Sequence, residues 1–160
     1  MEPEDLAVLY QIESERSAWR VSSSGIPYSK YVLKQYLSMQ PADIFQSSEL
    51  RLTIQDSYSG NAVGVADLYG YSPVALKAEV GIALLKKEER KGYARKALEE
   101  LIQLANDKFR MHQLYAYVKT SNERSIKLFQ CAGFDIVATL KDWIYEDGAY
   151  NNVYLLQKFL

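Results

Sequence analysis

The chain passes from a strand into a helix through Glu89-Arg90-Lys91-Gly92-Tyr93-Ala94-Arg95, directly after the apolar run Val80-Gly81-Ile82-Ala83-Leu84-Leu85. A glycine and an alanine two positions apart at a helix start leave backbone N–H groups without side-chain cover. These groups carry the positive end of the helix dipole and readily bind phosphates. Arg90, Lys91 and Arg95 add three positive charges. The stretch predicts a phosphate-binding turn, although the same residues also fit a solvated surface turn.

Two familiar phosphate-binding motifs do not account for this turn. The dinucleotide fingerprint needs a glycine triplet, and only Gly92 is present here. The P-loop needs Gly-Lys-Ser or Gly-Lys-Thr, which the chain lacks. The ligand should therefore be a phosphate compound of another kind.

Hydrophobic periodicity predicts one α/β domain over residues 1–160. Proline and acidic residues at 3–5 open a first helix that should run to about Trp19. The remaining helices are expected at 29–39, 92–110 and 123–132, and the strands at 50–55, 62–69, 80–85, 113–120, 134–145 and 149–159.

A second motif lies in the later helix, Asn122-Glu123-Arg124-Ser125-Ile126-Lys127-Leu128-Phe129. Asn122 is a good N-cap, and Gly133 in Ala132-Gly133-Phe134 suits the residue after a helix end. Together with Gly92-Tyr93-Ala94, in this order and at this spacing, these blocks make the chain resemble the GNAT superfamily of N-acetyltransferases. The resemblance is greatest to its spermidine- and ribosomal-protein-acetyltransferase-like branch.

The resemblance implies an α/β fold, with a mixed, largely antiparallel sheet and a central pair of splayed parallel strands flanked by helices. It also implies transfer of an acetyl group from acetyl-CoA to a primary amine by direct attack in a ternary complex. A non-catalytic acetyl-CoA-binding or regulatory domain is the alternative. Relatives begin with a further strand before the first helix, so either the sheet is one strand short or another segment covers its edge.

The resemblance also implies which residues contact the cofactor, position by position. The pantetheine should pair with the backbone of Ala83, Leu84 and Leu85. Asn122 should hydrogen-bond the cofactor, with Ser125 and Lys127 near the adenosine-phosphate end. Glu89 replaces the usual Gln or Arg and is expected to face solvent, because a carboxylate repels a pyrophosphate. The pyrophosphate should lie on Arg90, Lys91, Gly92, Tyr93, Ala94 and Arg95.

Acetyl transfer needs an unprotonated amine, and freeing a lysine-like amine near neutral pH costs about 4 kcal/mol. Glu79, on the strand leading to the cofactor turn, is the candidate base; alternatively it is a structural carboxylate paired with Lys77 or Arg51. The backbone N–H of Leu84 is the candidate oxyanion donor.

The proton donor to the departing thiolate is open. The resemblance places Phe129 beside the cofactor, where relatives have a tyrosine, and phenylalanine cannot donate a proton. Tyr115, Tyr117, Tyr93 or a water could substitute, or the thiolate could leave unassisted. Each tyrosine also fits a packing role.

The acceptor class is also open. Polyamine-acetylating relatives carry carboxylates after the first helix, whereas residues 20–28 hold one arginine and no acid. Glu13, Glu15, Asp142 and Glu146 still leave room for a cationic acceptor. A small amine, a polyamine, an amino-sugar and a protein N-terminal amine remain alternatives.

Composition excludes several other classes. The net charge of −1 argues against nucleic-acid binding. A single histidine, His112, and a single cysteine rule out a His-based metal site and an internal disulfide. Cys131 is expected to be a small core residue rather than a nucleophile. Trp19 and Trp143 are expected to pack in the core; the alternative is the acceptor pocket, which in the resembling family is formed by the first helix, the loop after it and the late strand. The acidic start and the lack of a long apolar run predict a cytoplasmic protein without a membrane partner. A homodimer is left open.

Overall fold

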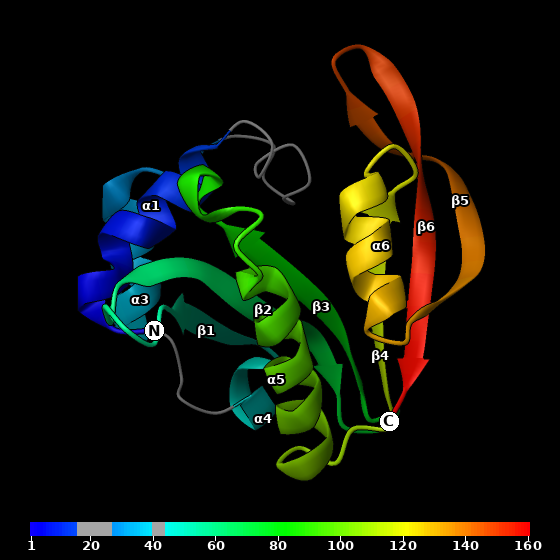
Figure 1. The fold of residues 1–160 in the computed structure, drawn as a ribbon, viewed down its shortest axis with the longest axis horizontal. Coiled ribbons are helices and arrows are strands. Elements are labelled where there is room, and N and C mark those ends of the chain that lie inside the picture. The colour runs from blue at the N-terminus through cyan, green and yellow to red at the C-terminus, as the bar shows by residue number, and fades with distance from the viewer. Residues whose placement is uncertain (16–26, 40–43) are drawn as a thin grey trace.

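The computed structural model describes residues 1–15, 27–39 and 44–160. Its centre is a six-stranded sheet with the strand order β1-β2-β3-β4-β6-β5 (Figure 1). All neighbouring strands are antiparallel except β3 and β4, which are parallel. This confirms the predicted mixed sheet with a central parallel pair. The strands are β1 (Leu50–Gln55), β2 (Ala62–Ser72), β3 (Lys77–Leu84), β4 (Gln113–Lys119), β5 (Asp135–Glu146) and β6 (Ala149–Phe159).

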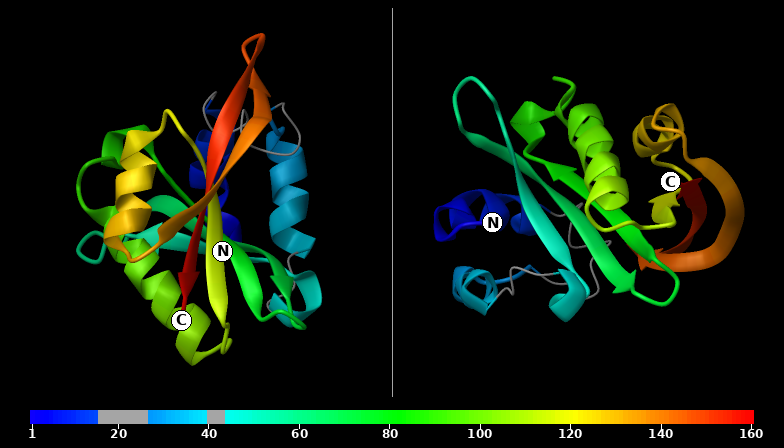
Figure 2. Two further views of the ribbon diagram at one scale, coloured as in Figure 1. Left: turned by 90° about the vertical axis from the view of Figure 1, so that its right-hand side faces the viewer. Right: turned by 90° about the horizontal axis from the view of Figure 1, so that it is seen from below.

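Helices cover both faces of the first three strands, as the two views of Figure 2 show. The 3-10 turn η1 (Pro3–Asp5), α1 (Leu6–Ser14) and α3 (Lys30–Met39) lie on one face. The helix α5 (Tyr93–Asp107) lies on the other, where α6 (Glu123–Cys131) joins the same core. The short elements α4 (Ile44–Ser47) and η2 (Lys86–Glu88) complete the described fold. Because β2 is covered on both faces, all of its residues from 63 to 68 are buried.

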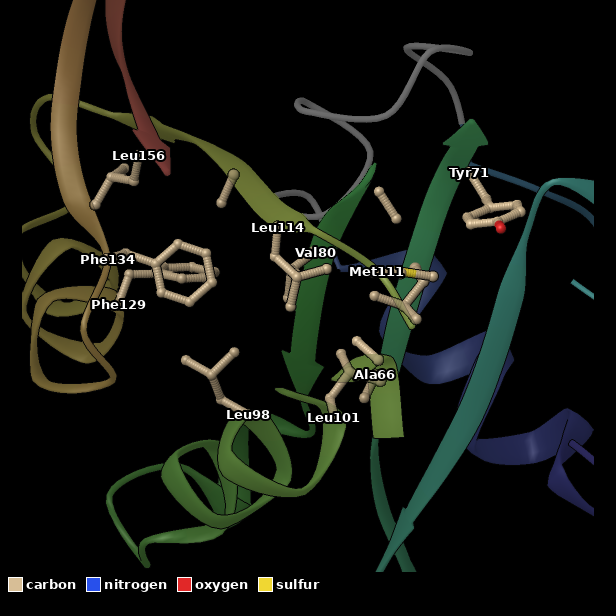
Figure 3. Packing of buried hydrophobic residues seen from close by; sticks show 14 of the residues in the cluster. Ala66, Tyr71, Val80, Leu98, Leu101, Met111, Leu114, Phe129, Phe134 and Leu156 are labelled. Carbon is tan, nitrogen blue, oxygen red and sulfur yellow. The ribbon is translucent and has the colours of Figure 1, made fainter. Parts of the chain in front are cut away.

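The main core lies between the sheet and the helices α5 and α6 (Figure 3). Leu98 and Leu101 of α5 pack there with alternate residues of β3 and β4, such as Val80 and Leu114. These strand residues recur at every second position, because successive side chains of a strand point to opposite faces. A smaller cluster on the opposite face holds Leu9, Ile12, Leu33, Val65 and Leu85.

The parallel strands β3 and β4 pair over only three positions. Lys77, Ala78 and Glu79 oppose Gln113, Leu114 and Tyr115, and no pairing follows although both strands continue. On its other side β4 stays paired with β6 along its whole length. The strands therefore diverge after Glu79 and Tyr115 and form a fork (Figure 1).

The β5–β6 hairpin extends beyond the rest of the sheet (Figure 1). Trp143 is 57% exposed on this hairpin, so the prediction that it packs in the core is wrong. Its indole ring instead stacks on Tyr117 of β4, with ring centroids 6.0 Å apart. Trp19 lies outside the described residues.

Three other features differ from the sequence-based expectation. The first helix ends at Ser14 rather than near residue 19, because Glu15 has an extended backbone with ψ of 126°. Cys131 is exposed at the end of α6 rather than in the core. The third strand begins at Lys77, three residues before the apolar run. No helix in the described parts of the chain is long and apolar enough to cross a membrane.

Candidate active site

The predicted anion-binding turn has the backbone that its glycine requires. Gly92 is the N-cap residue of α5 with φ of +90°, and no side chain caps the helix. A Cβ atom at Gly92 would meet nothing within 4 Å, so the left-handed backbone rather than crowding favours glycine. The first intrahelical bond runs from the Lys96 N–H to the Gly92 carbonyl. The N–H groups of the first turn are therefore directed outward, as an anion site needs.

The cations of this turn are held only by exposed partners. Lys91 pairs with Glu88 at 2.9 Å, and Arg95 pairs with Glu99 at 2.9 Å one helical turn later. Such surface pairs contribute little free energy, so an arriving phosphate can displace them. Arg90 makes no ion pair with any residue that the structure describes.

Contrary to the prediction, the Glu89 side chain does not simply face solvent. Its carboxylate forms an ion pair with Arg124 of α6, 2.7 Å apart, and 37% of its side chain is exposed. The pair joins the cofactor turn to the first turn of α6. It keeps the carboxylate occupied by a cation, which reduces its repulsion of a nearby anion.

A second contact fixes the turn on its other side. The Tyr93 hydroxyl donates a hydrogen bond of 2.6 Å to Asp56, in the β1–β2 hairpin turn. This bond is the main reason that the pKa of Asp56 falls to about 2. Sequence reasoning missed Asp56, because the two residues are 37 positions apart.

Along β3, the backbone N–H and carbonyl groups of every second residue point into the fork. The Leu85 N–H donates to Val63 of β2, and the Leu85 carbonyl accepts from Glu88. Backbone groups alternate in direction along a strand, so Ala83 also faces β2, whereas Ile82 and Leu84 face the open fork. Among the three residues predicted to pair with the pantetheine arm, the backbone direction therefore favours Leu84, because the Leu85 N–H is bonded to β2 and Ala83 faces β2 as well. Leu84 keeps a fork-facing N–H, and Ile82 is a fork residue that the sequence reasoning missed.

At the start of α6, Asn122 is the N-cap, as predicted. Its side-chain carbonyl accepts a hydrogen bond from the Ser125 N–H at 3.1 Å. Ser125 is half-buried and Lys127 exposed on the following turn. Phe129 is only 5% exposed and packs edge-to-face on Phe134, with centroids 5.0 Å apart (Figure 3). Its ring thus contributes to the core that supports the fork.

Glu79 is the last residue of β3 that pairs with β4. It lies opposite Tyr115 on β4 and opposite Tyr69 on β2. Its burial raises the pKa of the carboxyl group above the usual value. Within the described chain Glu79 forms no ion pair, so neither proposed structural partner, Lys77 or Arg51, holds it.

Arg51 is held by a separate cluster on the same face of the sheet. It pairs with Asp67 at 2.7 Å and with Glu13 at 3.0 Å, and it donates a hydrogen bond of 2.7 Å to Tyr69. Tyr36 of α3 lies over the guanidinium group, 5.5 Å from its ring centroid. Burial opposes the charge of Arg51, yet the charges of Asp67 and Tyr69 raise its pKa. The cluster therefore keeps this cation away from Glu79.

The structure does not favour Tyr93, Tyr115 or Tyr117 as the proton donor to the CoA thiolate. The Tyr93 hydroxyl donates a hydrogen bond to Asp56, which raises the pKa of Tyr93. Burial, with the nearby charge of Glu79, raises the pKa of Tyr115. Tyr117 is 39% exposed and stacks on Trp143. The geometry therefore favours a water or an unassisted thiolate over these tyrosines.

A cavity of about 440 Å³ lies between the end of α1 and the start of the cofactor turn. Its lining includes Tyr10, Glu15 and Leu85. A smaller depression of about 180 Å³ lies on the same side of the sheet, over β4 and β6. Among the described residues, no group of three or more His, Cys, Asp or Glu side chains is arranged to hold a metal ion.

Comparison with known proteins agrees with this geometry. The sequence model of the acetyltransferase (GNAT) domain matches residues 1–135. The spermidine N(1)-acetyltransferase of Vibrio cholerae is 24% identical over 117 residues, which is 71% of this chain and 67% of that protein. A putative ribosomal N-acetyltransferase of Bacillus subtilis is 26% identical over 60% of this chain and 52% of its own length.

Solved structures match over almost the whole chain. The spermidine N-acetyltransferase of Vibrio cholerae in complex with CoA and spermine has a TM-score of 0.87 and 21% identity, covering 99% of this chain and 92% of that one. A dodecameric structure of the same enzyme has a TM-score of 0.83 and 22% identity, with 99% and 90% covered. At these identities the likeness concerns the fold. With the family match over residues 1–135, it leads to one conclusion: the chain belongs to the GNAT family of acetyltransferases.

Proposed function

We propose that the chain transfers the acetyl group of acetyl-CoA to a primary amine, with Glu79 as the general base at the point where β3 and β4 separate. The observation that carries the proposal is the position of Glu79. It is half-buried at the fork and free of ion pairs with the described residues, and it lies on the strand that leads to the anion-binding turn.

The cofactor is proposed to lie along β3, with its phosphates on the turn. The N–H groups of Tyr93, Ala94 and Arg95 supply the dipole end of α5, and Arg90 and Lys91 supply charge. Gly92 permits the close approach of the backbone. Asn122 has its amide nitrogen available as a donor, since its oxygen caps α6, while Ser125 and Lys127 extend toward the adenosine-phosphate end.

The fork supplies the remaining groups. The backbone of Leu84 is proposed to pair with the pantetheine arm. The oxyanion donor is better assigned to Ile82 than to Leu84, because Leu84 lies about 17 Å along the strand from Glu79. Ile82 is about 10 Å away and has the same backbone direction. Phe129 supports the fork from the core and does not act as an acid.

The chemistry then proceeds by direct attack. Glu79 accepts a proton from the acceptor ammonium, directly or through a water, and its raised pKa brings it closer to the operating pH. The free amine attacks the thioester carbonyl, and the oxyanion accepts a hydrogen bond from the backbone N–H. The tetrahedral intermediate expels the CoA thiolate, and its nitrogen loses the second proton to water or to that thiolate, which leaves the neutral amide. A thiol of pKa near 8.5 is a tolerable leaving group without a dedicated acid.

We further propose that the acceptor is a primary amine and that the protein forms a homo-oligomer. The named relatives are a spermidine N(1)-acetyltransferase and a putative ribosomal N-acetyltransferase, and one related structure is described as dodecameric. These names support a primary amine as the acceptor and a homo-oligomer as the assembly.

Release of free thiol from acetyl-CoA tests the proposal. The purified chain is incubated with acetyl-CoA and a panel of primary amines, and the amide product is identified by mass spectrometry. We expect turnover that falls strongly in Glu79→Gln, while acetyl-CoA still raises the melting temperature of that variant. Binding of acetyl-CoA without transfer to any amine would instead indicate a non-catalytic domain.

A further inference from the structure

The cofactor turn, residues 89–95, has a backbone that its own sequence only partly favours. Arg90 has φ of +64° and Gly92 has φ of +90°, both in the left-handed region. Glycine adopts this region readily, whereas a residue with a Cβ atom is strained there. No side chain caps the helix that follows. Contacts with other parts of the chain are therefore needed to hold the turn in this shape.

Contacts with distant residues lie on both sides of Gly92. Before it, Glu89 pairs with Arg124, and the two side chains are 37% and 60% exposed. After it, Tyr93 donates a hydrogen bond of 2.6 Å to the Oδ2 atom of Asp56. An exposed pair of long side chains contributes little, whereas a short hydrogen bond to a carboxylate is among the stronger kinds. The Asp56 contact is therefore the firmer of the two.

Asp56 is itself held in place by the β1–β2 hairpin turn. Its Oδ1 atom accepts hydrogen bonds from the N–H and the hydroxyl group of Ser59, each 2.8 Å long. The Asp56 N–H donates to the Asn61 carbonyl at 2.9 Å, and the Asp56 carbonyl accepts from the Gly60 N–H at 2.8 Å. These bonds close the turn and leave Oδ2 for Tyr93. The hairpin thus presents a fixed acceptor to the start of α5.

The charge of Asp56 does not favour the cofactor by attraction. Its pKa of about 2 keeps the carboxyl group ionised at neutral pH, and an ionised carboxylate repels a phosphate. Its contribution is therefore geometric. It fixes the side chain of Tyr93, whose backbone N–H is one of those that meet the phosphate under the proposed function.

We propose that Asp56 is a positioning residue for the cofactor. Through the Tyr93 hydroxyl it holds the first turn of α5 so that the N–H groups of residues 93–95 converge on the pyrophosphate of acetyl-CoA. Asp56 acts through Tyr93 and not on the reacting atoms, so its effect falls on cofactor affinity rather than on the chemical step. This inference rests on the proposed function and adds to it a residue of the β1–β2 hairpin.

Calorimetric titration with CoA, which is not consumed, tests the inference. Tyr93→Phe and Asp56→Ala should each raise the Kd about tenfold, the size expected for loss of a hydrogen bond to a charged group. The double variant should lose no more than either single variant, because both remove the same contact. Asp56→Asn keeps a polar partner for the hydroxyl and should bind CoA within about twofold of the wild type. Tyr58→Phe, which alters a 98% exposed ring of the same hairpin turn, is the matched control.

Two further readouts separate positioning from a general loss of stability. In Tyr93→Phe, the KM for acetyl-CoA should rise about tenfold, while kcat at saturating acetyl-CoA stays within about twofold of the wild type. Dephospho-CoA lacks the 3′-phosphate but keeps the pyrophosphate, so its affinity should fall by the same factor as that of CoA.

The inference is overturned if Tyr93→Phe binds CoA as tightly as the wild type, or if Asp56→Asn is as weak as Asp56→Ala. Losses that multiply in the double variant, or a loss confined to CoA and absent for dephospho-CoA, would also contradict it. A wild-type chain that does not bind CoA would overturn the proposed cofactor site, and the inference with it. Binding of CoA without transfer to any amine would overturn only the proposed transfer, since the titrations remain valid.

Discussion

Glu79 and Tyr115 face each other at the last paired position of β3 and β4, and beyond them the two strands separate. The carboxylate therefore lies where the fork begins. The backbone of Ile82 and Leu84 continues from it along β3, and the ring-bearing residue opposite it on β4 is Tyr115. Because Arg51 is held by Asp67 and Glu13, this carboxylate remains available for an incoming ammonium group.

Glu79→Gln should reduce activity and increase stability. Loss of a general base lowers kcat by about 10²–10⁴-fold. Burial raises the pKa of Glu79 in the folded chain, so protonation of Glu79 stabilises the fold at low pH, and this contribution is lost as pH rises through the raised pKa. The variant should therefore melt at a higher temperature than the wild type at pH 8, and at a similar temperature at pH 4.

Thermal unfolding of both proteins at the two pH values, alongside turnover, checks this prediction. Glu123→Gln, which neutralises an exposed carboxylate on α6, is the control for net charge. Equal melting-temperature differences at pH 4 and pH 8 would count against a half-buried ionised Glu79.

Gly92→Ala should weaken acetyl-CoA binding without removing the fold. The new Cβ meets no atom within 4 Å, but φ of +90° is strained for alanine by about 1–2 kcal/mol. Relief of that strain moves the turn away from its anion-binding shape. Calorimetric titration with acetyl-CoA measures the loss. Gly148→Ala has the same open surroundings and φ of +82°, and it should lower stability similarly but leave the affinity unchanged.

Glu89→Gln should tighten acetyl-CoA binding about threefold, the size of a modest surface charge effect. The substitution removes a negative charge from the turn and frees Arg124, which Glu89 now holds at 2.7 Å. The gain should shrink at high ionic strength, because salt screens exposed charges. Titrations at low and high salt measure it. If Glu123→Gln has the same effect, net charge rather than the position of Glu89 is responsible.

Tyr93→Phe should return the pKa of Asp56 from about 2 toward its ordinary value of 3.8, since the Tyr93 hydrogen bond is its largest cause. A lowered folded pKa stabilises the fold above the unfolded pKa, and this contribution is lost as pH falls toward 2. NMR titration of the Asp56 carboxyl carbon gives the value directly. Tyr58→Phe, which alters a 98% exposed ring in the same hairpin turn, should leave it unchanged.

Much of the site could be located from the sequence because its signals are local. The glycine of the cofactor turn, the N-cap asparagine of α6 and the alternation of β4 each reflect the backbone preference of a few adjacent residues. The family resemblance then supplied the mixed sheet and the splayed parallel pair, whereas the order of the strands came from the structure. Glu79 was expected on the strand that leads to the turn at Gly92, and it lies on β3.

Contacts between residues far apart in the sequence could not be predicted from such local signals. The choice of Ile82 and Leu84 over Ala83 and Leu85 depends on which strand receives the Leu85 N–H. The sequence shows that backbone directions alternate, but not in which phase. Cys131 was expected inside because cysteine is usually buried, yet it lies on the outer side of α6.

By itself, the sequence determined most of the helices and strands, the glycine turn before α5 and the family, since helix caps, strand alternation and a positive φ at Gly92 depend on neighbours along the chain. Only the tertiary structure decided how the charges pair. Arg51 meets Asp67 and Glu13, Arg124 meets Glu89, and Glu79 is left without a partner among the described residues. These pairings depend on strand register and helix packing, which bring together residues far apart in the sequence.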